Sequence, residues 1–580
     1  MIKKLSKCIR EYKLPTILTL LFIVGEVIIE VLIPFKTAAL VDRIKDGADI
    51  SLVIKDGIIL AIMAVLSLIS GGIAGYTCAK ASAGFAKNLR SDLFKKIQTY
   101  SFENIDNFSS VSLVTRLTTD VSNVQMSFMM LIRTAIRSPL MLIFSFFMSF
   151  YMGKSLAFVF VLVVPFLAIG LLLVAKNAMP AFRSMFKKYD RLNESIEENV
   201  RGMRVVKGFS REEYEKEKFN KAAEDIRKDF TKAERIVALN TPIMQICLYF
   251  IMVFVLTVGS NLAIVSDFVD VGQISAILTY GMQILMSLMM LSFIFVMLTM
   301  SAESSKRICE VLDEKSALAN IENPLYEVKD GSIEFKNVSF KYSSIAEKYS
   351  LEGINLKIKS GSTVGIIGGT GSSKTTLVQL IPRLYDTTDG EILVGGVNVK
   401  NYDLDTLRHS VAMVRQKNLL FSGTIKENLK WGNNNATDEE IIEACKLSMA
   451  DEFIQSFPEK YDTKIEQGGT NVSGGQKQRI CIARALLRKP KILILDDSTS
   501  AVDTKTDAYI RDGLKKYIPD TTKIIIAQRI SSVEDADMII VLNNGKIESV
   551  GNHKELIKIS NIYSEVYEQQ TKGGKSNDEK

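Results

Sequence analysis

The stretch TVGIIGGTGSSKTTL, residues 363–377, predicts an apolar strand, a glycine-rich turn and the start of a helix. A turn of this kind binds phosphate through backbone N–H groups, while a lysine reaches the terminal phosphates and a hydroxyl binds Mg²⁺. Lys374 and Thr375 fit these two roles. The expected nucleotide-binding residues of the turn are Gly368, Gly369, Thr370, Gly371, Ser372, Ser373, Lys374, Thr375 and Thr376.

One position departs from the strict pattern, which has glycine immediately before the lysine. Ser373 stands there instead. A serine adds a Cβ atom where the backbone approaches phosphate closely. We expect this residue to weaken or reshape nucleotide binding.

A second stretch, ILILDDSTSAVD at 492–503, places two acidic residues at the end of an apolar strand. Asp496 lies about 120 residues after Lys374 and would supply a second contact to Mg²⁺. Strand and helix patterns alternate from residue 331 onward, which favours an α/β domain with a largely parallel sheet.

A third stretch, NVSGGQKQR at 471–479, predicts another anion site. Ser473, Gly474 and Gly475 would open a helix, and exposed N–H groups at a helix N-terminus attract anions. A second phosphate site is unexpected in a domain that binds one nucleotide. It is explained if it serves the nucleotide of a second, similar domain.

The first half of the chain has a different pattern, with six apolar runs long enough to cross a membrane. We place these spans at about 14–35, 54–79, 129–152, 155–178, 238–264 and 273–300. Residues 176–235 contain sixteen Lys and Arg, whereas 262–272 contain none. Because basic loops favour the cytoplasmic side, we expect both termini and both long loops there, in a multi-pass protein of the cell membrane. Helices buried in a soluble bundle are the alternative.

Composition excludes several other classes. The formal charge of +7 is modest and is explained by cytoplasmic loops beside a membrane, so we expect no nucleic-acid partner. The six cysteines have no paired spacing, which indicates a reducing compartment without a disulfide framework or zinc site. The first apolar run is too long for a signal peptide.

The predicted fold class is therefore a multidomain membrane protein, an all-α six-helix transmembrane domain followed by an α/β P-loop nucleotide-binding domain. The expected boundaries are a transmembrane domain at 1–315, a linker at 316–330, a nucleotide-binding domain at 331–570 and a disordered tail at 571–580.

Together these motifs resemble the ATP-binding cassette (ABC) exporters, and the resemblance covers nearly the whole chain. It rests on Walker A at 368–375, the Q-loop residue Gln416, the signature at 472–476, Walker B at 492–496, the D-loop SAVD at 500–503, and Tyr342, which matches the aromatic residue that stacks on adenine. In that family two cassettes close head to tail over two ATP molecules. The resemblance implies ATP and Mg²⁺ as cofactors and alternating access in the membrane half.

The resemblance also implies roles for individual residues. Thr375, Gln416 and Asp496 would bind the metal, and Asp497, Gln528 and Gln416 would occupy the catalytic positions. The residues expected to complete the partner's ATP site are Ser473, Gly474, Gly475, Gln476 and Asp503. The stretch 199–219 resembles the second intracellular loop, whose short coupling helix contacts a cassette; a solvated charged helix is the alternative.

Two catalytic positions depart from the family pattern. The family's base is a glutamate, and Asp497 is shorter by one C–C bond, roughly 1.5 Å. The family's switch histidine is replaced by Gln528, which cannot carry positive charge. With Ser373 these departures resemble the degenerate-site subunit of heterodimeric bacterial multidrug exporters. We therefore expect an ATP-hydrolysing translocase paired with a non-identical half-transporter, with hydrolysis mainly at the partner's site.

Two other functions remain open from the sequence. A regulatory or sensor subunit would bind ATP without driving transport, and a slow homodimeric lipid exporter would have two degenerate sites. The intact signature favours the heterodimer. The expected substrates are hydrophobic or amphipathic compounds, drug-like or lipid-like, taken from the cytoplasm or inner leaflet, and membrane lipid is an expected partner.

Five residues in the membrane half are candidates for substrate binding. Glu26 and Glu30 lie one helical turn apart and should avoid lipid. A salt bridge to Arg133 or Arg137 is disfavoured, because counting along the predicted helices places those arginines near the inner leaflet. Protonation, a wet vestibule or a partner contact would also account for the pair. Met282, Met286 and Met289 form a stripe that suits promiscuous binding, with packing or lipid contact as the alternative.

Overall fold

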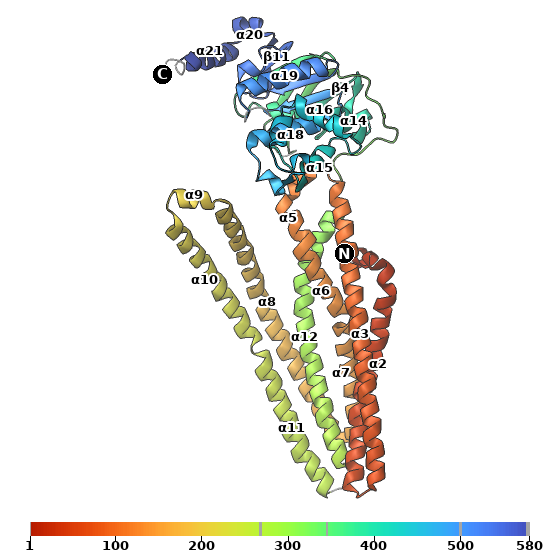
Figure 1. Cartoon of the computed structure of the whole chain (residues 1–580). Coiled ribbons are helices and arrows are strands. Elements are labelled where there is room, and N and C mark those ends of the chain that lie inside the picture. Colours follow the sequence, from red (N-terminus) through yellow and green to blue (C-terminus); the bar gives the residue numbers. More distant parts are fainter. Residues whose placement is uncertain (1, 266–268, 344–345, 498–501, 576–580) are drawn as a thin grey trace. The chain divides into compact units, whose positions relative to one another are not determined.

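The computed structural model describes residues 2–265, 269–343, 346–497 and 502–575 (Figure 1). It forms two compact units. One comprises Met1–Thr99 and Ser109–Glu314, and the other comprises Tyr100–Phe108 and Lys315–Lys580. The second unit thus includes a short segment from the first half of the sequence.

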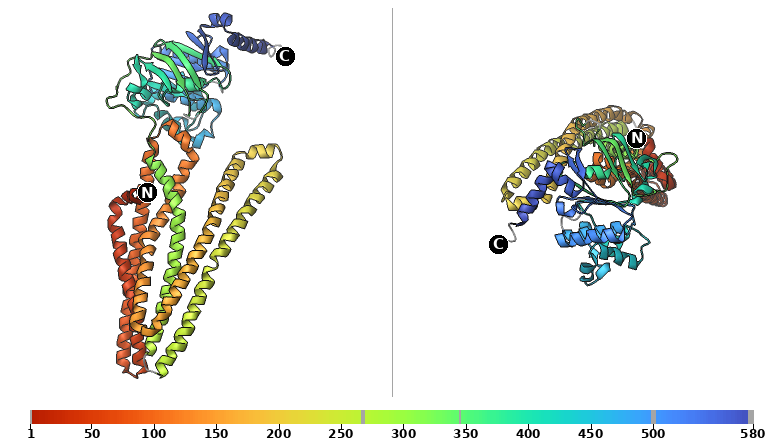
Figure 2. Two further views of the ribbon diagram at one scale, coloured as in Figure 1. Left: turned by 180° about the vertical axis from the view of Figure 1, so that it is seen from behind. Right: turned by 90° about the horizontal axis from the view of Figure 1, so that it is seen from above.

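The first unit is entirely helical. Its elements are α1 Ile2–Leu5, η1 Ser6–Tyr12, α2 Lys13–Lys45, α3 Ile50–Gln98, α5 Ser110–Thr115, η2 Arg116–Asp120, α6 Val121–Ile132, α7 Thr134–Gly153, η3 Lys154–Ala157, α8 Phe158–Arg201, α9 Met203–Gly208, α10 Glu212–Val237, α11 Asn240–Val265 and α12 Val271–Asp313. Both views of Figure 2 show α8 and α10 side by side, joined at their ends by α9.

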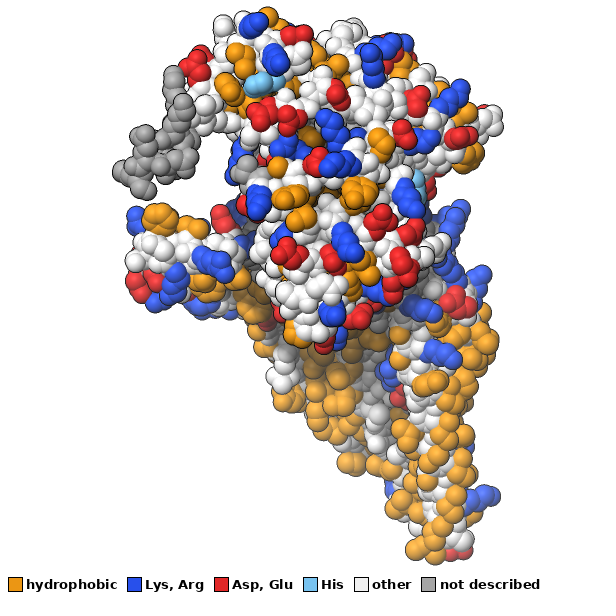
Figure 3. All heavy atoms as spheres, turned by 45° about the horizontal axis from the view of Figure 1, so that its top comes forward, with side chains coloured by type: hydrophobic (Ala, Val, Ile, Leu, Met, Phe, Trp, Pro, Cys, Tyr) orange, Lys and Arg blue, Asp and Glu red, His pale blue; other side chains and the backbone are white. Residues whose placement is uncertain are grey.

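The prediction of six membrane-crossing helices is confirmed. Among the described residues, six helical stretches are long and apolar enough to span a bilayer, at Lys3–Lys45, Ile50–Gln98, Ser110–Gly153, Ser155–Phe182, Glu212–Ile264 and Val271–Asp313. Most extend well beyond the predicted spans, because polar helical segments continue the apolar ones. Figure 3 shows hydrophobic side chains covering much of the visible surface of these helices, as lipid contact requires.

The second unit contains a six-stranded sheet in the order β12-β11-β3-β10-β9-β6, in which only the β11–β12 pair is antiparallel. A four-stranded antiparallel sheet has the order β2-β1-β4-β5, and β7 pairs with β8. The strands are β1 Ile333–Phe340, β2 Leu351–Ile358, β3 Thr363–Gly368, β4 Asp389–Val394, β5 Val397–Asn398, β6 Val411–Val414, β7 Gly423–Thr424, β8 Lys464–Ile465, β9 Ile492–Asp496, β10 Thr522–Ile526, β11 Met538–Asn543 and β12 Lys546–Gly551.

The second unit also contains α-helices and short 3-10 helices. They are α4 Phe102–Phe108, α13 Lys374–Gln379, η4 Val399–Asn401, α14 Leu404–Ser410, α15 Ile425–Lys430, α16 Asp438–Leu447, α17 Asp451–Gln455, η5 Lys460–Asp462, η6 Gln467–Gly469, α18 Gly474–Leu486, α19 Thr504–Tyr517, η7 Ile530–Ser532, α20 His553–Ile559 and α21 Asn561–Lys575. α21 extends into the tail expected to be disordered, and residues 576–580 lie outside the described ones.

The parallel strands are apolar on both faces because each face packs against a separate core. In β9, Ile492 and Ile494 belong to the core beside the antiparallel sheet, whereas Leu493 and Leu495 belong to the core beneath α16 and α18. This alternation follows from the two-residue period of a strand. It fixes the carboxyl ends of β3 and β9, where ligands bind in folds of this class.

Candidate nucleotide-binding site

The glycine-rich turn connects the end of β3 at Gly368 to the start of α13 at Lys374. Lys374 Nζ donates to the carbonyl oxygens of Gly368 at 2.8 Å and Gly369 at 2.9 Å. Burial lowers the pKa of Lys374, and the carboxylates of Asp497 and Asp496 oppose that effect. The ammonium group is thus held at the turn, next to the N-terminus of α13, where phosphate would bind.

Ser373 has a backbone conformation that favours glycine. Its φ is +69° and its ψ is +27°, in the left-handed region. A side chain in this region costs about 1–2 kcal/mol relative to the right-handed one. The departure predicted from the sequence is therefore a strained position, in the residue that begins the phosphate-binding helix.

Thr375 and Asp496 lie together, as predicted. Thr375 Oγ1 donates to Asp496 Oδ1 at 3.1 Å, and Asp496 is buried. Burial raises the pKa of Asp496, and the hydrogen bond from Thr375 opposes this effect. One hydroxyl and one carboxylate are hard oxygen ligands that fit Mg²⁺, which usually takes its remaining ligands from water and nucleotide phosphates.

No group of three or more His, Cys, Asp or Glu side chains with metal-binding geometry occurs in the described part of the chain. Mg²⁺ bound by Thr375 and Asp496 would therefore depend on the nucleotide for further ligands. When bound, the ion would neutralise phosphate charge, which is its usual contribution to phosphoryl transfer.

The three predicted catalytic residues meet at one carboxylate oxygen. Gln416 Nε2 donates to Asp497 Oδ2 at 3.0 Å, and Gln528 Nε2 donates to the same oxygen at 2.8 Å. Asp497 is buried and has a φ of +48°. Two amide donors therefore engage Oδ2, one of the two oxygens with which the Asp497 carboxylate would accept a proton from water.

Tyr342 lies beside the glycine-rich turn. Its hydroxyl is 2.9 Å from Thr376 Oγ1, and 46% of the residue is exposed. The ring makes an edge-to-face contact with Tyr385, with centroids 5.3 Å apart. An exposed aromatic ring anchored to the turn is compatible with stacking on a purine.

Tyr385 was not predicted from the sequence. It donates to Asp106 Oδ2 of α4 at 2.7 Å, and its ring packs against Phe102 of the same helix. Arg415, next to Gln416, lies over the Phe102 ring, with its guanidinium carbon 5.7 Å from the ring centroid. Tyr342 and the Q-loop are therefore both connected to a short helix from the first long loop. No local motif in FENIDNF indicates this pairing, because it joins segments far apart in sequence.

The signature residues form a separate helix start. Ser473 caps α18 reciprocally: its hydroxyl accepts from Gln476 N at 3.2 Å, and its own N–H donates to Gln476 Oε1 at 2.9 Å. Gly474 and Gly475 follow, and Ser473 and Gly474 are exposed. Among the residues that the structure describes, these four make no hydrogen bond to the glycine-rich turn. The backbone N–H groups of Ser473 and Gln476 are engaged in the cap, and Ser473 and Gly474 lie at the surface.

The D-loop is only partly described. Asp503 caps α19 by accepting from Thr506 N at 2.9 Å, and Val502 is buried. Ser500 and Ala501 lie outside the described residues. The predicted role of Asp503 at the partner's site therefore stays a prediction.

In the first unit, the sequence predicted that Arg137 lies too deep in the inner leaflet to pair with Glu26 and Glu30. This prediction is wrong. Arg137 Nη2 lies 2.6 Å from Glu30 Oε2, and Arg137 Nε lies 3.4 Å from Glu26 Oε1. The predicted helix ends caused the error. Because α2 continues to Lys45 and α7 ends at Gly153, Glu30 lies 15 residues before one end and Arg137 lies 16 residues before the other.

Arg137 pairs more closely with Glu30 than with Glu26. Glu26 is buried, and its Oε2 has no hydrogen-bond partner among the described atoms. Both oxygens lie against Gly71 of α3, where an added Cβ atom would approach them within 3.2 and 3.4 Å. Met282 and Met286 of α12 are about half exposed, and Met289 is partly buried.

This fold and this site define a class: a membrane protein in which a P-loop nucleotide-binding domain follows six spanning helices. Residues 16–288 match the family described as ABC transporter transmembrane region, and residues 351–500 match the family described as ABC transporter. The chain belongs to the ABC transporter family, with the transmembrane region and the nucleotide-binding domain fused in one polypeptide.

Similar proteins agree with this assignment. The chain is 35% identical to the uncharacterized ABC transporter ATP-binding protein YfiB of Bacillus subtilis (strain 168), over 98% of each chain. It is 32% identical to the uncharacterized ABC transporter ATP-binding protein Rv1273c of Mycobacterium tuberculosis (strain ATCC 25618 / H37Rv), over 97% of each. The fold resembles that of a bacterial Atm1-family ABC exporter with ATP bound, with a TM-score of 0.83, 23% identity, and coverage of 97% of this chain and 98% of the other.

Proposed function

We propose that this chain is one subunit of a heterodimeric ATP-driven exporter. In this proposal it binds ATP at a site of low activity and lends its signature helix to the competent site of a different half-transporter. Alternating access would then be driven mainly by hydrolysis at that second site.

The observation that carries the proposal is the arrangement around Asp497. Its Oδ2 atom receives both Gln416 and Gln528. A carboxylate shorter than glutamate by roughly 1.5 Å holds a water farther from phosphate, and a 1 Å misplacement can cost about 100-fold in rate. Gln528 can donate a hydrogen bond to phosphate but supplies no positive charge.

The remaining residues favour retention of ATP binding. Lys374 would exchange the carbonyl oxygens of Gly368 and Gly369 for phosphate oxygens, and Tyr342 offers an exposed ring for adenine. Thr375 and Asp496 would hold Mg²⁺. Retention of these candidate binding residues beside a shortened acidic side chain supports slow turnover rather than loss of the nucleotide.

A regulatory subunit is the second candidate function, and the same weak catalysis would suit it. The intact cap of α18 argues against it, because a pure regulator does not need to complete a partner's catalytic site. A homodimer is disfavoured because both of its sites would contain Asp497 and Gln528.

The decisive experiment compares ATP hydrolysis by the purified chain with hydrolysis by a complex of the chain and a half-transporter that has a glutamate base and a switch histidine. We expect slow turnover alone and restored turnover in the complex. Mutation of the partner's glutamate should then abolish activity, whereas Asp497→Asn should change it little. Rapid hydrolysis by the single chain would contradict the proposal.

For substrates, we propose hydrophobic or amphipathic compounds, including cationic ones. Glu26 and Glu30 place two carboxyl groups beside the single cation Arg137, and Oε2 of Glu26 has no hydrogen bond within the described chain. A cationic substrate could therefore compete with Arg137 for Glu26. The exposed Met282 and Met286 would supply adaptable apolar contact.

The substrate proposal is tested with Glu26→Gln/Glu30→Gln in the assembled transporter. Transport of a cationic dye should fall while transport of a neutral dye is retained. Glu217→Gln/Glu303→Gln is the control, because it removes two exposed charges elsewhere. Unchanged transport of both dyes would reject a role in substrate binding.

We further propose that the chain lies in the cell membrane with its termini and nucleotide-binding domain in the cytoplasm. Sixteen basic residues in 176–235, against none in 262–272, support that orientation.

A further inference from the structure

The chain begins with a short basic segment that packs beside the membrane helices. α1 and η1 bury Leu5 and Cys8 and expose Lys3, Lys4 and Lys7. Several contacts attach the segment to α3; among them, Arg10 Nη2 lies 2.7 Å from Asp92 Oδ1, and Asn88 Nδ2 donates to the carbonyl oxygen of Cys8 at 3.0 Å. The lysines are therefore presented on the outer face of an anchored segment.

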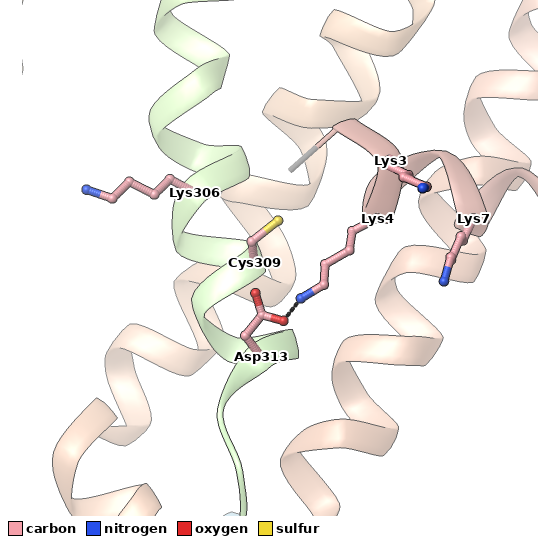
Figure 4. Close-up of a pocket in the computed structure, with 6 residues that line it drawn as sticks. All are labelled: Lys3, Lys4, Lys7, Lys306, Cys309 and Asp313. Atoms are coloured by element: carbon pink, nitrogen blue, oxygen red, sulfur yellow. Dashed lines mark ion pairs between the residues drawn. The ribbon is translucent and has the colours of Figure 1, made fainter.

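A cavity of about 310 Å³ lies between this segment and the last turns of α12 (Figure 4). Its lining residues are Lys3, Lys4, Lys7, Lys306, Cys309 and Asp313. Four lysines against one aspartate leave a formal charge of +3. Lys4 forms an ion pair with Asp313, and within the described chain Lys3, Lys7 and Lys306 form none.

Neighbouring acidic residues are already paired with other cations. Glu310 Oε2 lies 3.3 Å from Arg116 Nη2, and Asp120 forms an ion pair with Arg307. Neither of these two carboxylates is therefore free to neutralise the excess positive charge at the cavity. An anionic ligand would supply the missing charge.

The position of the cavity indicates where such an anion comes from. The lipid-facing surface of α2 begins directly after the basic segment, with Leu14 65% exposed, Ile17 59% and Leu21 62%. Lysine side chains at such a boundary lay their methylene groups along apolar surface and place the ammonium group among lipid headgroups. Basic pockets beside membrane helices on the cytoplasmic side are typical headgroup sites.

We propose that this cavity binds the headgroup of an anionic phospholipid from the adjoining leaflet, with the positive charges of Lys3, Lys7 and Lys306, which line it, attracting the phosphate. The inference rests on the proposed cytoplasmic orientation of the N-terminus. A bound headgroup would compete with Asp313 for Lys4 and join the basic segment to the end of α12, the helix that leads into the linker.

Cys309 provides a reporter inside the cavity. It is partly exposed, whereas the other five cysteines are buried. The test measures the rate at which a maleimide modifies Cys309 in the full-length chain, in neutral detergent micelles with increasing phosphatidylglycerol. We expect phosphatidylglycerol to slow the modification and phosphatidylcholine to have no effect. A Cys309→Ser variant establishes that the signal comes from this residue.

Charge variants test the lysines. Lys3→Gln/Lys7→Gln should raise the phosphatidylglycerol concentration needed for half protection about 30-fold, because it removes two lysines that attract the anionic headgroup. Lys306→Gln should raise it less. Lys221→Gln/Lys232→Gln on α10, which removes two lysines away from the cavity, should leave it unchanged.

Three outcomes would overturn the proposal: no protection, equal protection by phosphatidylcholine, or equal protection by soluble glycerol phosphate. The last would indicate a site for a cytoplasmic anion rather than a lipid. The readout requires neither hydrolysis nor a partner chain. A failed lipid test and a failed heterodimer test can therefore be distinguished.

Discussion

The nucleotide-binding domain has two surfaces that we predict to bind phosphate, and they differ in how many of the residues needed for that chemistry they retain. On the P-loop face, defined by Ser373, Asp497 and Gln528, one backbone position is strained and the base is both short and occupied by amides. On the signature face, residues 473–476, the helix cap is complete. Impairment of the P-loop face alone is expected if the two faces contact different ATP molecules.

The largest expected effect is on the signature face. Ser473→Ala in the mixed complex should lower ATP hydrolysis by about 100-fold or more, because the hydroxyl and adjacent N–H groups would stabilise phosphate charge in the partner's site. Steady-state ATPase assays measure this loss. The same mutation also removes a helix cap, worth about 1 kcal/mol.

Thr437→Ala separates these two effects. Thr437 caps α16 with the same reciprocal arrangement, using Glu440. It should cost similar stability in thermal unfolding while hydrolysis stays near that of the unmodified complex. Equal loss of hydrolysis in both variants would mean that the signature serves only as a cap.

Repair of the P-loop face should produce the next largest effect. Asp497→Glu/Gln528→His restores the longer carboxylate and the imidazole, and turnover by the single chain should rise by about 10–100-fold. Asp497→Glu alone should recover less, because Gln528 still lacks positive charge. If the repaired chain hydrolyses ATP no faster than the unmodified chain, the differences between the two faces do not limit its turnover.

In the membrane half, Arg137→Gln should destabilise the protein by about 3 kcal/mol, because it leaves Glu26 and Glu30 without their cation in a partly buried site. This loss is at the low end for a buried ion pair, since 38% of the Arg137 side chain is exposed. Thermal unfolding in detergent measures the change.

Two variants sharpen this measurement. Arg137→Gln/Glu30→Gln should recover much of the lost stability by removing one unpaired charge. Arg43→Gln, which breaks the more exposed pair with Asp56, should cost no more than about 1 kcal/mol. If Arg43→Gln and Arg137→Gln lower the free energy of unfolding equally, burial does not increase the stability that depends on the ion pairs of Arg137.

The smallest expected effect concerns Ser373. Ser373→Gly should stabilise the protein by about 1 kcal/mol, because glycine adopts a positive φ without steric cost. Thermal unfolding and ATP titration measure it. Ser362→Gly, at a position without positive φ, should instead destabilise slightly. Destabilisation by both substitutions would contradict the strain assigned to Ser373.

Local motifs predicted a glycine-rich turn after β3, the strand end at Asp496 and a helix that begins after Ser473, and the structure has all three; the nucleotide, metal and partner-site roles of these residues stay predictions. Each depends on a few consecutive residues or on the convergence of strand ends in a parallel sheet. The depth of Arg137 was predicted wrongly, because apolar runs mark where a helix crosses lipid but not where polar turns extend it. The contact between Tyr385 and Asp106 was missed because it joins residues distant in the sequence.

The sequence by itself determined the family, the two-domain order, the six spans and the replacement of glutamate and histidine by Asp497 and Gln528, since all of these are recorded in residue type and spacing. Only the tertiary structure decided that both Gln416 and Gln528 donate to one oxygen of Asp497, that Arg137 reaches Glu30, and that lysines from both ends of the helical unit surround one cavity. The physical reason is that hydrogen bonds and ion pairs act over about 3 Å, and packing alone brings distant segments within that range.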